Sequence, residues 1–379
     1  MQPIRTTHTG SLPRPDDLLE LLASRANGDN PAALAERADR AVREVVREQV
    51  EAGLDLVNDG EQEKEGYATY VRERLTGFDG EATYAPRRPE LDAHPDYADR
   101  MRERLSRGLI RVPACTGDIR LRDPEAVQHD IGVLKDAARA AGVEDDRLFL
   151  TAASPGVVAH FFVDQHYRNR DAYLAAIADA MRPEYEAIAA AGITLQIDAP
   201  DLAMSRNTRF ADLSLEEFRR EVARNVEALN HVLTKVPAER SRLHLCWGNY
   251  EGPHTLDVGL GQIIDLVLGA KPAGISVEAA NPRHGHEWKV FEDVRLPDDR
   301  YVIPGVIDST TNFVEHPELV AQRLTNYARV VGPERVVGGT DCGFGTFAGM
   351  GAVVPTITWA KLGALVEGAR LASGQAAPA

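Results

Sequence analysis

Cysteine is scarce in this sequence, with only three residues in a chain of 379. So few thiols exclude a disulfide framework of the kind that holds small secreted proteins together, and they fit a reducing compartment. We therefore expect a cytoplasmic protein. Because each cysteine is rare, the residues around it are informative.

Positive charge is also in short supply. The chain has 43 Lys and Arg against 58 Asp and Glu, a net charge of −15, and no tract of basic residues. Binding to phosphates needs a basic surface, so we expect no nucleic-acid partner. No apolar run approaches the roughly 20 residues of a membrane span, and MQPIRTTHTGSLPRPDD at the start lacks the apolar centre of a signal peptide. We expect no membrane association.

What the sequence does have is a regular alternation of short apolar runs with long amphipathic segments rich in Ala, Leu, Glu and Arg. This alternation predicts a parallel sheet with helical crossovers. The runs that read as strands are 4–8, 54–59, 109–114, 148–153, 193–199, 242–247, 274–279, 301–307 and 335–341. The segments that read as helices are 31–52, 170–191, 214–235, 259–269, 316–330 and 355–371.

We predict an α/β fold of the (β/α)8 TIM-barrel type, formed as one domain by residues 1–371. The strand list exceeds the eight of a barrel by one, and the weakest member, 109–114, is either an insertion hairpin or a frayed strand. The alternative is an open doubly wound sheet, but no G-x-G-x-x-G loop follows the first strand. Residues 62–108 are polar and read as a long insertion or lid after strand 2, and 372–379 as a flexible tail.

Polar residues end most of the predicted strands. In a barrel, these carboxyl ends surround one opening, where such folds carry their chemistry. The residues concerned are Thr9, Gly10, Ser11, Asp59, Gly60, Glu61, Asp198, His244, Cys246, Glu278, Asp308, Asp341 and Cys342.

Two of these residues, His244 and Cys246, lie in the run RLHLCW. Side chains at i and i+2 of a strand point to the same face, so the imidazole and the thiol converge. Together with Glu278 and Cys342 they would offer nitrogen, sulfur and oxygen donors of the kind that zinc prefers. Buried cysteines in strands are also common as small apolar residues, and Cys115 in VPACTGD fits that description. The residues alone leave a metal site and a packed core both open.

The stretches HTGSLPRP, DGE, LQIDAP, HLCWGN, VEAANPR and TDCGFGT, in this order, resemble the catalytic domain of cobalamin-independent methionine synthase and its single-barrel relatives. These relatives include the epoxyalkane:coenzyme M transferases. The resemblance covers roughly residues 4–371. It implies a (β/α)8 barrel that holds Zn2+ through His244, Cys246, Glu278 and Cys342.

The resemblance also implies an activity. The zinc activates a thiol as the zinc-bound thiolate, which attacks a methyl group; with homocysteine the product is methionine. The family pattern places Ser11, Glu61 and Asp198 around the amino acid. Two carboxylates in one pocket suit an α-ammonium, and backbone N–H groups near Ser11 suit an α-carboxylate.

The sequence departs from the family pattern on the side of the methyl donor. SPGVVAHFF offers Phe161 or Phe162 where the family stacks a tryptophan on the pterin, and IDSTTN places Ser309 where the family has a histidine. His254, His284 and His286 are nearby in sequence and are further candidates for proton transfer, although histidines in a stretch such as NPRHGHEWK are more often solvated. The donor is folate, a methylated corrinoid on another protein, or a non-methyl electrophile.

Three hypotheses therefore stand. The first is methyl transfer to homocysteine. The second is alkyl transfer from an electrophile such as an epoxide to another thiol such as coenzyme M. The third is a barrel that binds zinc or a ligand without catalysis. The metal-free decarboxylases of the same superfamily are more distant, since they have no use for the two ligand cysteines.

Overall fold

The computed structural model describes residues 3–25, 31–82, 88–105 and 113–374. Its centre is a parallel sheet of seven strands in the order β1-β10-β9-β8-β7-β6-β4. The strands are β1 (Arg5–Thr6), β4 (Phe149–Ala153), β6 (Thr194–Asp198), β7 (Ser241–His244), β8 (Gly274–Glu278), β9 (Tyr301–Ile307) and β10 (Val337–Thr340).

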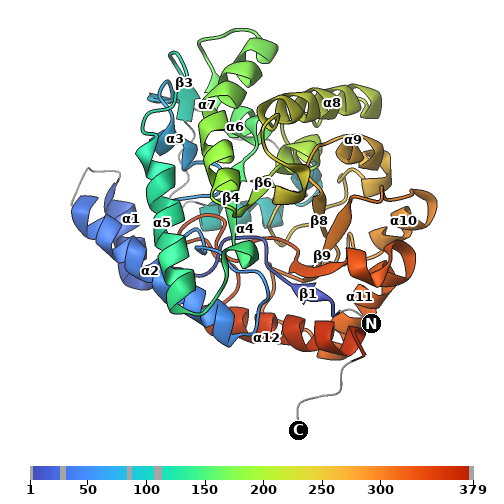
Figure 1. Ribbon diagram of the computed structural model, residues 1–379. Coiled ribbons are helices and arrows are strands. Elements are labelled where there is room, and N and C mark those ends of the chain that lie inside the picture. Colours follow the sequence, from blue (N-terminus) through green and yellow to red (C-terminus); the bar gives the residue numbers. More distant parts are fainter. Residues whose placement is uncertain (1–2, 26–30, 83–87, 106–112, 375–379) are drawn as a thin grey trace.

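Helices surround this sheet (Figure 1). They are α1 (Asp16–Arg25), α2 (Pro31–Glu51), α3 (Val71–Arg74), α4 (Pro95–Leu105), α5 (Glu125–Ala140), α6 (Pro155–Phe161), α7 (Arg170–Ala190), α8 (Leu215–Val232), α9 (Ile264–Leu268), α10 (Val290–Asp293), α11 (Pro317–Val331) and α12 (Pro355–Ala372). Short 3-10 helices complete the set at Pro89–Ala93, Asp145–Arg147, Pro200–Leu202, Met204–Asn207, Ala238–Arg240, Leu260–Gln262, Glu287–Lys289 and Pro333–Arg335.

The two edges of the sheet, β1 and β4, are joined by the segment 54–58. The N–H of Leu56 donates to the carbonyl of Thr6 in β1 at 3.0 Å, and the N–H of Phe149 in β4 donates to the carbonyl of Val57 at 3.1 Å. The predicted strand 54–59 is therefore reduced to a single parallel bridge between Val57 and Leu148. The α/β fold with its parallel sheet is confirmed, and its arrangement is consistent with a TIM-like barrel.

The ninth predicted strand, 109–114, does not join this sheet. Residues 109–112 lie outside the described residues, and Pro113–Cys115 form β3 of a separate sheet of three strands. There β3 pairs antiparallel with β2 (Gly80–Glu81) and parallel with β5 (Val163–Asp164). The insertion-hairpin alternative for this run is thus closer to the structure than a strand of the main sheet.

The apolar pattern of the sequence explains the core. β4, β8 and β10 are buried along their whole length, as expected for strands covered on both faces. α8 begins with a capping box, in which the Ser214 hydroxyl accepts from the Glu217 N–H and the Glu217 carboxylate accepts from the Ser214 N–H. At the other end of the chain Ala372 still belongs to α12, and Ser373 is buried against Ile4, so the predicted tail begins later than residue 372. Residues 375–379 lie outside the described part.

Among the described helices, none combines the length and the apolar character needed to cross a membrane.

Candidate active site

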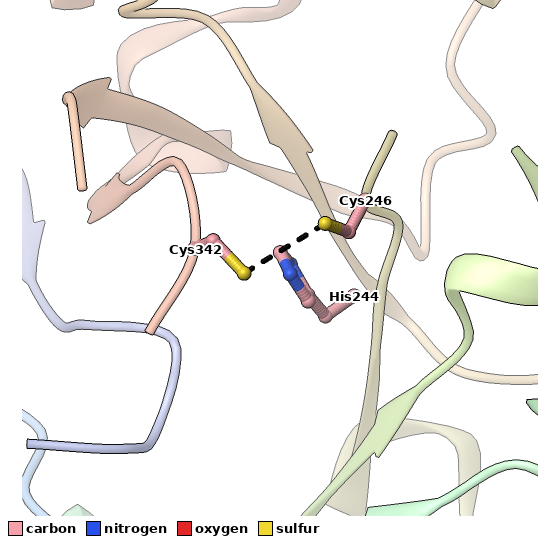
Figure 2. Close-up of side chains that lie close together, drawn as sticks. All are labelled: His244, Cys246 and Cys342. Carbon is pink, nitrogen blue, oxygen red and sulfur yellow. Dashed lines mark hydrogen bonds between the residues drawn. The ribbon is translucent and has the colours of Figure 1, made fainter. Parts of the chain in front are cut away.

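Three of the predicted metal ligands meet at the carboxyl ends of β7 and β10. His244 is the last residue of β7, and the Leu245 N–H continues the ladder to the carbonyl of Ser276 in β8 at 2.9 Å. The chain therefore stays extended through Cys246, which brings its thiol to the same face as the imidazole. Cys342 follows β10 by two residues. Figure 2 shows the three side chains pointing toward one another.

The distances within this metal cluster (His244, Cys246 and Cys342) suit a metal ion. The two Sγ atoms are 3.7 Å apart, and one ligand atom from each residue lies within 4.8 Å of the others. Two sulfurs bound to one tetrahedral zinc at about 2.3 Å are separated by about 3.8 Å. The cysteines thus lie at the spacing that a shared tetrahedral ion requires, without a disulfide between them.

His244 presents a free ring nitrogen to the cluster. Its Nδ1 lies 3.1 Å from the Ser276 hydroxyl, whereas its Nε2 is buried and has no hydrogen-bond partner among the described residues. Burial lowers the pKa of the His244 imidazole to about 3, so the ring is neutral. A neutral imidazole fixed through one nitrogen and free at the other is the usual state of a metal ligand.

The Cys246 thiol holds its proton when no cation is present. The pKa of Cys246 is raised well above its usual value, first by the hydrogen bond with Cys342 and then by burial. The Gly248 N–H donates to the Cys246 sulfur at 3.2 Å and opposes this shift. A bound divalent cation would favour the thiolate form over the thiol, because its positive charge offsets the repulsion between the two thiolates.

Glu278, the fourth predicted ligand, lies beside the cluster and outside the group of three. Its carboxylate accepts a hydrogen bond from the Trp247 N–H at 2.8 Å and another from the Asn281 side chain at 2.8 Å. Burial and then the neighbouring Cys246 raise the pKa of Glu278 well above its usual value. The structure thus brings the carboxylate next to Cys246 but holds it through hydrogen bonds.

Asp341 fixes the relative position of β8 and β10 at this end of the sheet. Its carboxylate accepts from the N–H groups of Ala279, Ala280 and Asn281 at 2.7, 2.8 and 2.8 Å. These three residues directly follow Glu278, and Cys342 directly follows Asp341. The aspartate therefore sets the distance between Glu278 and Cys342.

A second acidic group lies next to the cluster. Asp198 ends β6 and pairs in register with His244 in β7. Burial and then the charge of Glu61 raise the pKa of Asp198 well above its usual value, so the negative charge of Glu61 disfavours ionisation of Asp198. A cationic ligand between them would relieve this repulsion.

Glu61 occupies an unusual backbone position, with φ of +55° in the left-handed region. One carboxyl oxygen accepts from the Thr151 hydroxyl at 2.9 Å, and the other is buried without a partner among the described residues. Burial raises the pKa of Glu61, although Lys64 and Arg14 oppose the shift. Although the surrounding sequence EQEKE is charged, the structure buries the Glu61 carboxylate.

Ser11 packs against the loop that follows Cys342. Its hydroxyl accepts from the Gly345 N–H at 3.3 Å, and its carbonyl accepts from the Phe344 N–H at 2.8 Å. A side chain on Gly343 would come within 2.0 Å of the Ser11 hydroxyl, which requires glycine there. Ser11 is thus near Cys342.

A cavity of about 390 Å3 opens beside Cys342 and Glu278 and includes both weaker candidates, Ser309 and His254, in its lining. The Ser309 hydroxyl donates to the Asn249 side-chain oxygen at 2.9 Å. His254 contacts Asp257 through Nδ1 at 2.7 Å, and its Nε2 lies 3.1 Å from the carbonyl of Tyr250. Both side chains are present at the cavity, and both already have protein partners.

Behind His254 lies a residue that sequence reasoning placed wrongly in solvent. His284 is buried, and it contacts Asp257 at 3.1 Å and Glu287 at 2.9 Å. Burial alone would lower the pKa of His284, but the hydrogen bonds to Asp257 and Glu287 raise it to about 10. Its ring stacks on Trp247 with 4.2 Å between the centroids. The three-residue spacing of His284 and Glu287 on a helical turn was the available signal.

The two phenylalanines of SPGVVAHFF differ in position. Phe162 is fully buried and packs against Phe78, with 4.5 Å between the centroids. Phe161 is partly exposed and makes edge contacts with Tyr67 and Phe347. Burial raises the pKa of Tyr67 well above its usual value, and Cys246 and Cys342 add to the shift, so this aromatic group borders the metal cluster.

The chain is similar over most of its length to proteins of one known family. The family model described as "Cobalamin-independent synthase, Catalytic domain" matches residues 150–367, more than half of the chain. A methionine synthase of Saccharolobus solfataricus is 26% identical over 97% of this chain and 94% of its own length. A 2-hydroxypropyl-CoM lyase of Xanthobacter autotrophicus is 24% identical over 99% of this chain and 96% of its own.

Among solved structures, a B12-independent methionine synthase from Shewanella sp. W3-18-1, in complex with selenomethionine, superposes with a TM-score of 0.73. It is 21% identical, covers 98% of both chains, and supports the fold. The family match extends from β4 to α12 and includes the metal cluster. The chain belongs to the family of cobalamin-independent methionine synthase catalytic domains.

Proposed function

We propose that this protein is a zinc-dependent methyltransferase that methylates a thiol, with homocysteine as the favoured acceptor and methionine as the product. The observation that carries the proposal is the buried, unpartnered Nε2 of His244 facing two thiols 3.7 Å apart. An apolar core gains nothing from an orphaned nitrogen at this position, whereas a metal ligand requires one.

The proposed ligands are His244, Cys246, Cys342 and, as the fourth, Glu278. Nitrogen and sulfur donors favour zinc over magnesium or calcium. Bound there, Zn2+ would lower the pKa of a substrate thiol so that the sulfur is nucleophilic near neutral pH. The hydrogen bonds from Trp247 and Asn281 keep the Glu278 carboxylate next to the cluster with or without a metal bond.

We assign the amino-acid end of homocysteine to Ser11, Glu61 and Asp198. The unpartnered oxygen of Glu61 and the nearby Asp198 favour an ammonium group, which would let both carboxyl groups ionise. The Ser11 hydroxyl, which accepts from the Gly345 N–H beside Cys342, can donate its own proton to the α-carboxylate. Because Asp198 pairs with His244, the amino acid and the metal cluster lie on neighbouring strands.

The reaction is a displacement at carbon. The acceptor thiol loses its proton, its sulfur forms a bond to the methyl carbon, and the bond from that carbon to the donor breaks. The electron pair of the broken bond goes to the leaving group: a folate takes up a proton on its nitrogen, whereas a corrinoid leaves as Co(I) and needs none. Ser309 and His254, in the cavity lining, are the candidates for holding that proton.

We further propose that residues 1–371 form one closed (β/α)8 barrel with an insertion at 62–108, of which residues 83–87 and 106–108 lie outside the described residues. The donor is a folate or a methylated corrinoid. A relative that is a 2-hydroxypropyl-CoM lyase supports the second candidate function, alkyl transfer between coenzyme M and an epoxide-derived group. The third candidate is a barrel that binds zinc or a ligand without catalysis.

The experiment is to load the protein with zinc and incubate it with homocysteine and either 5-methyltetrahydrofolate or methylcobalamin. Mass spectrometry then follows methionine. Methionine that forms with zinc-loaded protein and not with metal-free protein is the expected result. If coenzyme M suppresses methionine formation and is itself alkylated by an epoxide, the second candidate replaces the first. No product with any pair, and a zinc that does not respond to thiols, would leave the non-catalytic candidate.

A further inference from the structure

Arg88 lies against the loop that follows β7, close to Cys246. Its guanidinium carbon is 4.1 Å from the centroid of the Tyr250 ring. Its Nη1 is 3.4 Å from the point that a side-chain carbon on Gly248 would occupy. Gly248 has φ of +117°, a conformation that favours glycine. This backbone therefore leaves room for the guanidinium next to the metal cluster.

The Arg88 side chain carries an unused donor. Its Nη1 is buried and has no hydrogen-bond partner among the described residues, although the side chain as a whole is partly exposed. Burial lowers the pKa of Arg88, and Glu90, Asp257 and Cys246 oppose the shift. A guanidinium stays protonated near neutral pH, and a buried charged donor without an acceptor costs free energy. An anionic ligand would satisfy it.

The turn that follows Arg88 is held against the loop after β7 by contacts that do not involve Arg88. Glu90 is buried in the turn Pro89–Ala93, where its carboxylate accepts from the Tyr250 hydroxyl and from the Thr255 N–H at 2.9 Å. These bonds hold the turn against the loop after β7 and fix the ring beneath the guanidinium. The position of Arg88 is thus set by its neighbours, which leaves Nη1 available for a ligand.

The same loop borders the cavity beside the cluster. Gly248 and Tyr250, the two residues that Arg88 approaches, line the cavity of about 390 Å3 together with Cys342 and Glu278. A reactant in this cavity therefore contacts both the metal cluster and the residues on which Arg88 rests.

We propose that Arg88 binds an anionic group, a carboxylate, sulfonate or phosphate, on a reactant whose other end reaches the metal cluster. The inference rests on the proposed function and adds a substrate class to it. A guanidinium fits such groups through two parallel hydrogen bonds, which an ammonium on lysine cannot form. This anionic group belongs either to the thiol acceptor or to the alkyl donor, and each case has its own test.

The acceptor is tested with cobalt-substituted protein, in which a bound thiolate gives a charge-transfer band. The matched probes are 2-mercaptoethanesulfonate and the neutral 2-mercaptoethanol. An acceptor-side site predicts that the sulfonate binds at least about tenfold more tightly. Arg88→Met should abolish this preference, and Arg88→Lys should restore part of it. Arg120→Met, at an exposed arginine, is the control and should change nothing.

The donor is tested by alkylating the bound 2-mercaptoethanol with iodoacetate or with neutral iodoacetamide. A donor-side site predicts that wild-type protein favours iodoacetate and that Arg88→Met loses the preference at unchanged cobalt content. An anion preference that depends on Arg88 in either arm supports the proposal and identifies the reactant. If neither experiment shows an anion preference, or if Arg88→Met keeps the preference in both, the proposal is overturned while the proposed function stands. If no thiol perturbs the cobalt spectrum, the proposed function fails and this inference falls with it.

Discussion

Cys115 and the pair Cys246/Cys342 are the same residue type in the same state, buried and free, yet their surroundings differ. Cys115 lies in the small sheet, where its thiol contacts the carbonyl of Gly117 at 3.5 Å. Burial raises its pKa to about 11. Cys246 instead has a second thiol at 3.7 Å and lies with it beside the orphaned nitrogen of His244.

The comparison shows that burial alone does not give a cysteine its role. A buried thiol with a backbone acceptor is complete as a small apolar residue. Two thiols facing an unpaired imidazole nitrogen are incomplete, because the lone pair of that nitrogen has no partner among the described residues. What separates the two regions is the set of neighbours supplied by distant strands.

The largest effect on zinc binding and turnover is expected when one thiol of the pair is removed. We expect Cys246→Ser or Cys342→Ser to lose bound zinc and to reduce turnover below about 1%, a larger effect than the roughly 10–100-fold cost of losing a group that supports a ligand. Metal analysis of the purified variants and methionine formation measure both. Full zinc occupancy in both variants would show that the cluster is not the metal site.

The next effect should appear at the carboxyl pair. Glu61→Gln and Asp198→Asn each remove a charge that we assign to the substrate ammonium, so the KM for homocysteine should rise about 100-fold, within the 2–5 kcal/mol range for breaking a buried charge pair. Zinc content should not change. Glu63→Gln, at a more exposed neighbouring carboxylate, serves as the control. An unchanged KM in both variants would contradict the assignment of these residues.

A smaller effect is expected at Asp341, which holds the backbone after Glu278. Asp341→Asn places an amide where a carboxylate accepts three N–H bonds, and we expect the free energy of unfolding to fall by about 2 kcal/mol. Urea denaturation measures the loss. Zinc affinity should fall as well, because Glu278 and Cys342 would no longer be fixed relative to each other. Unchanged stability would mean that the three N–H bonds contribute little.

The smallest effect is expected at Cys115, the cysteine that lies outside the cluster. Cys115→Ala should lower the free energy of unfolding by about 1 kcal/mol, as for the loss of one buried heavy atom, and leave zinc content and activity unchanged. Thermal unfolding and metal analysis suffice to measure this. A loss of zinc in Cys115→Ala would remove the distinction between the two regions.

The sequence predicted the strands of the main sheet well where they are apolar throughout. The runs 148–153, 193–199 and 274–279 correspond to β4, β6 and β8, because fully buried parallel strands have a strong signal. It failed where pairing is decided at long range. Residues 54–59 also read as a strand but form one bridge, and 113–115 pair in a separate sheet.

In the candidate site, too, features set by local spacing were predictable and most long-range contacts were not. The convergence of His244 and Cys246 followed from the period of two in an extended chain. The long-range partners could not be predicted: the fold brings the Trp247 N–H to Glu278 and the N–H groups of residues 279–281 to Asp341. For His284, the spacing to Glu287 was a local signal, whereas Asp257 comes from another loop. Arg88 was missed for a related reason: it lies far from β7 in the sequence and meets Tyr250 only in three dimensions.

The central claim is that the metal cluster binds and deprotonates a thiol. The most direct test is calorimetric titration of L-homocysteine into zinc-loaded protein in buffers of different ionisation enthalpy. The account predicts binding with the release of about one proton, because a metal-bound thiol is held as the thiolate. Binding without proton release, or no binding by protein that retains its zinc, would contradict it.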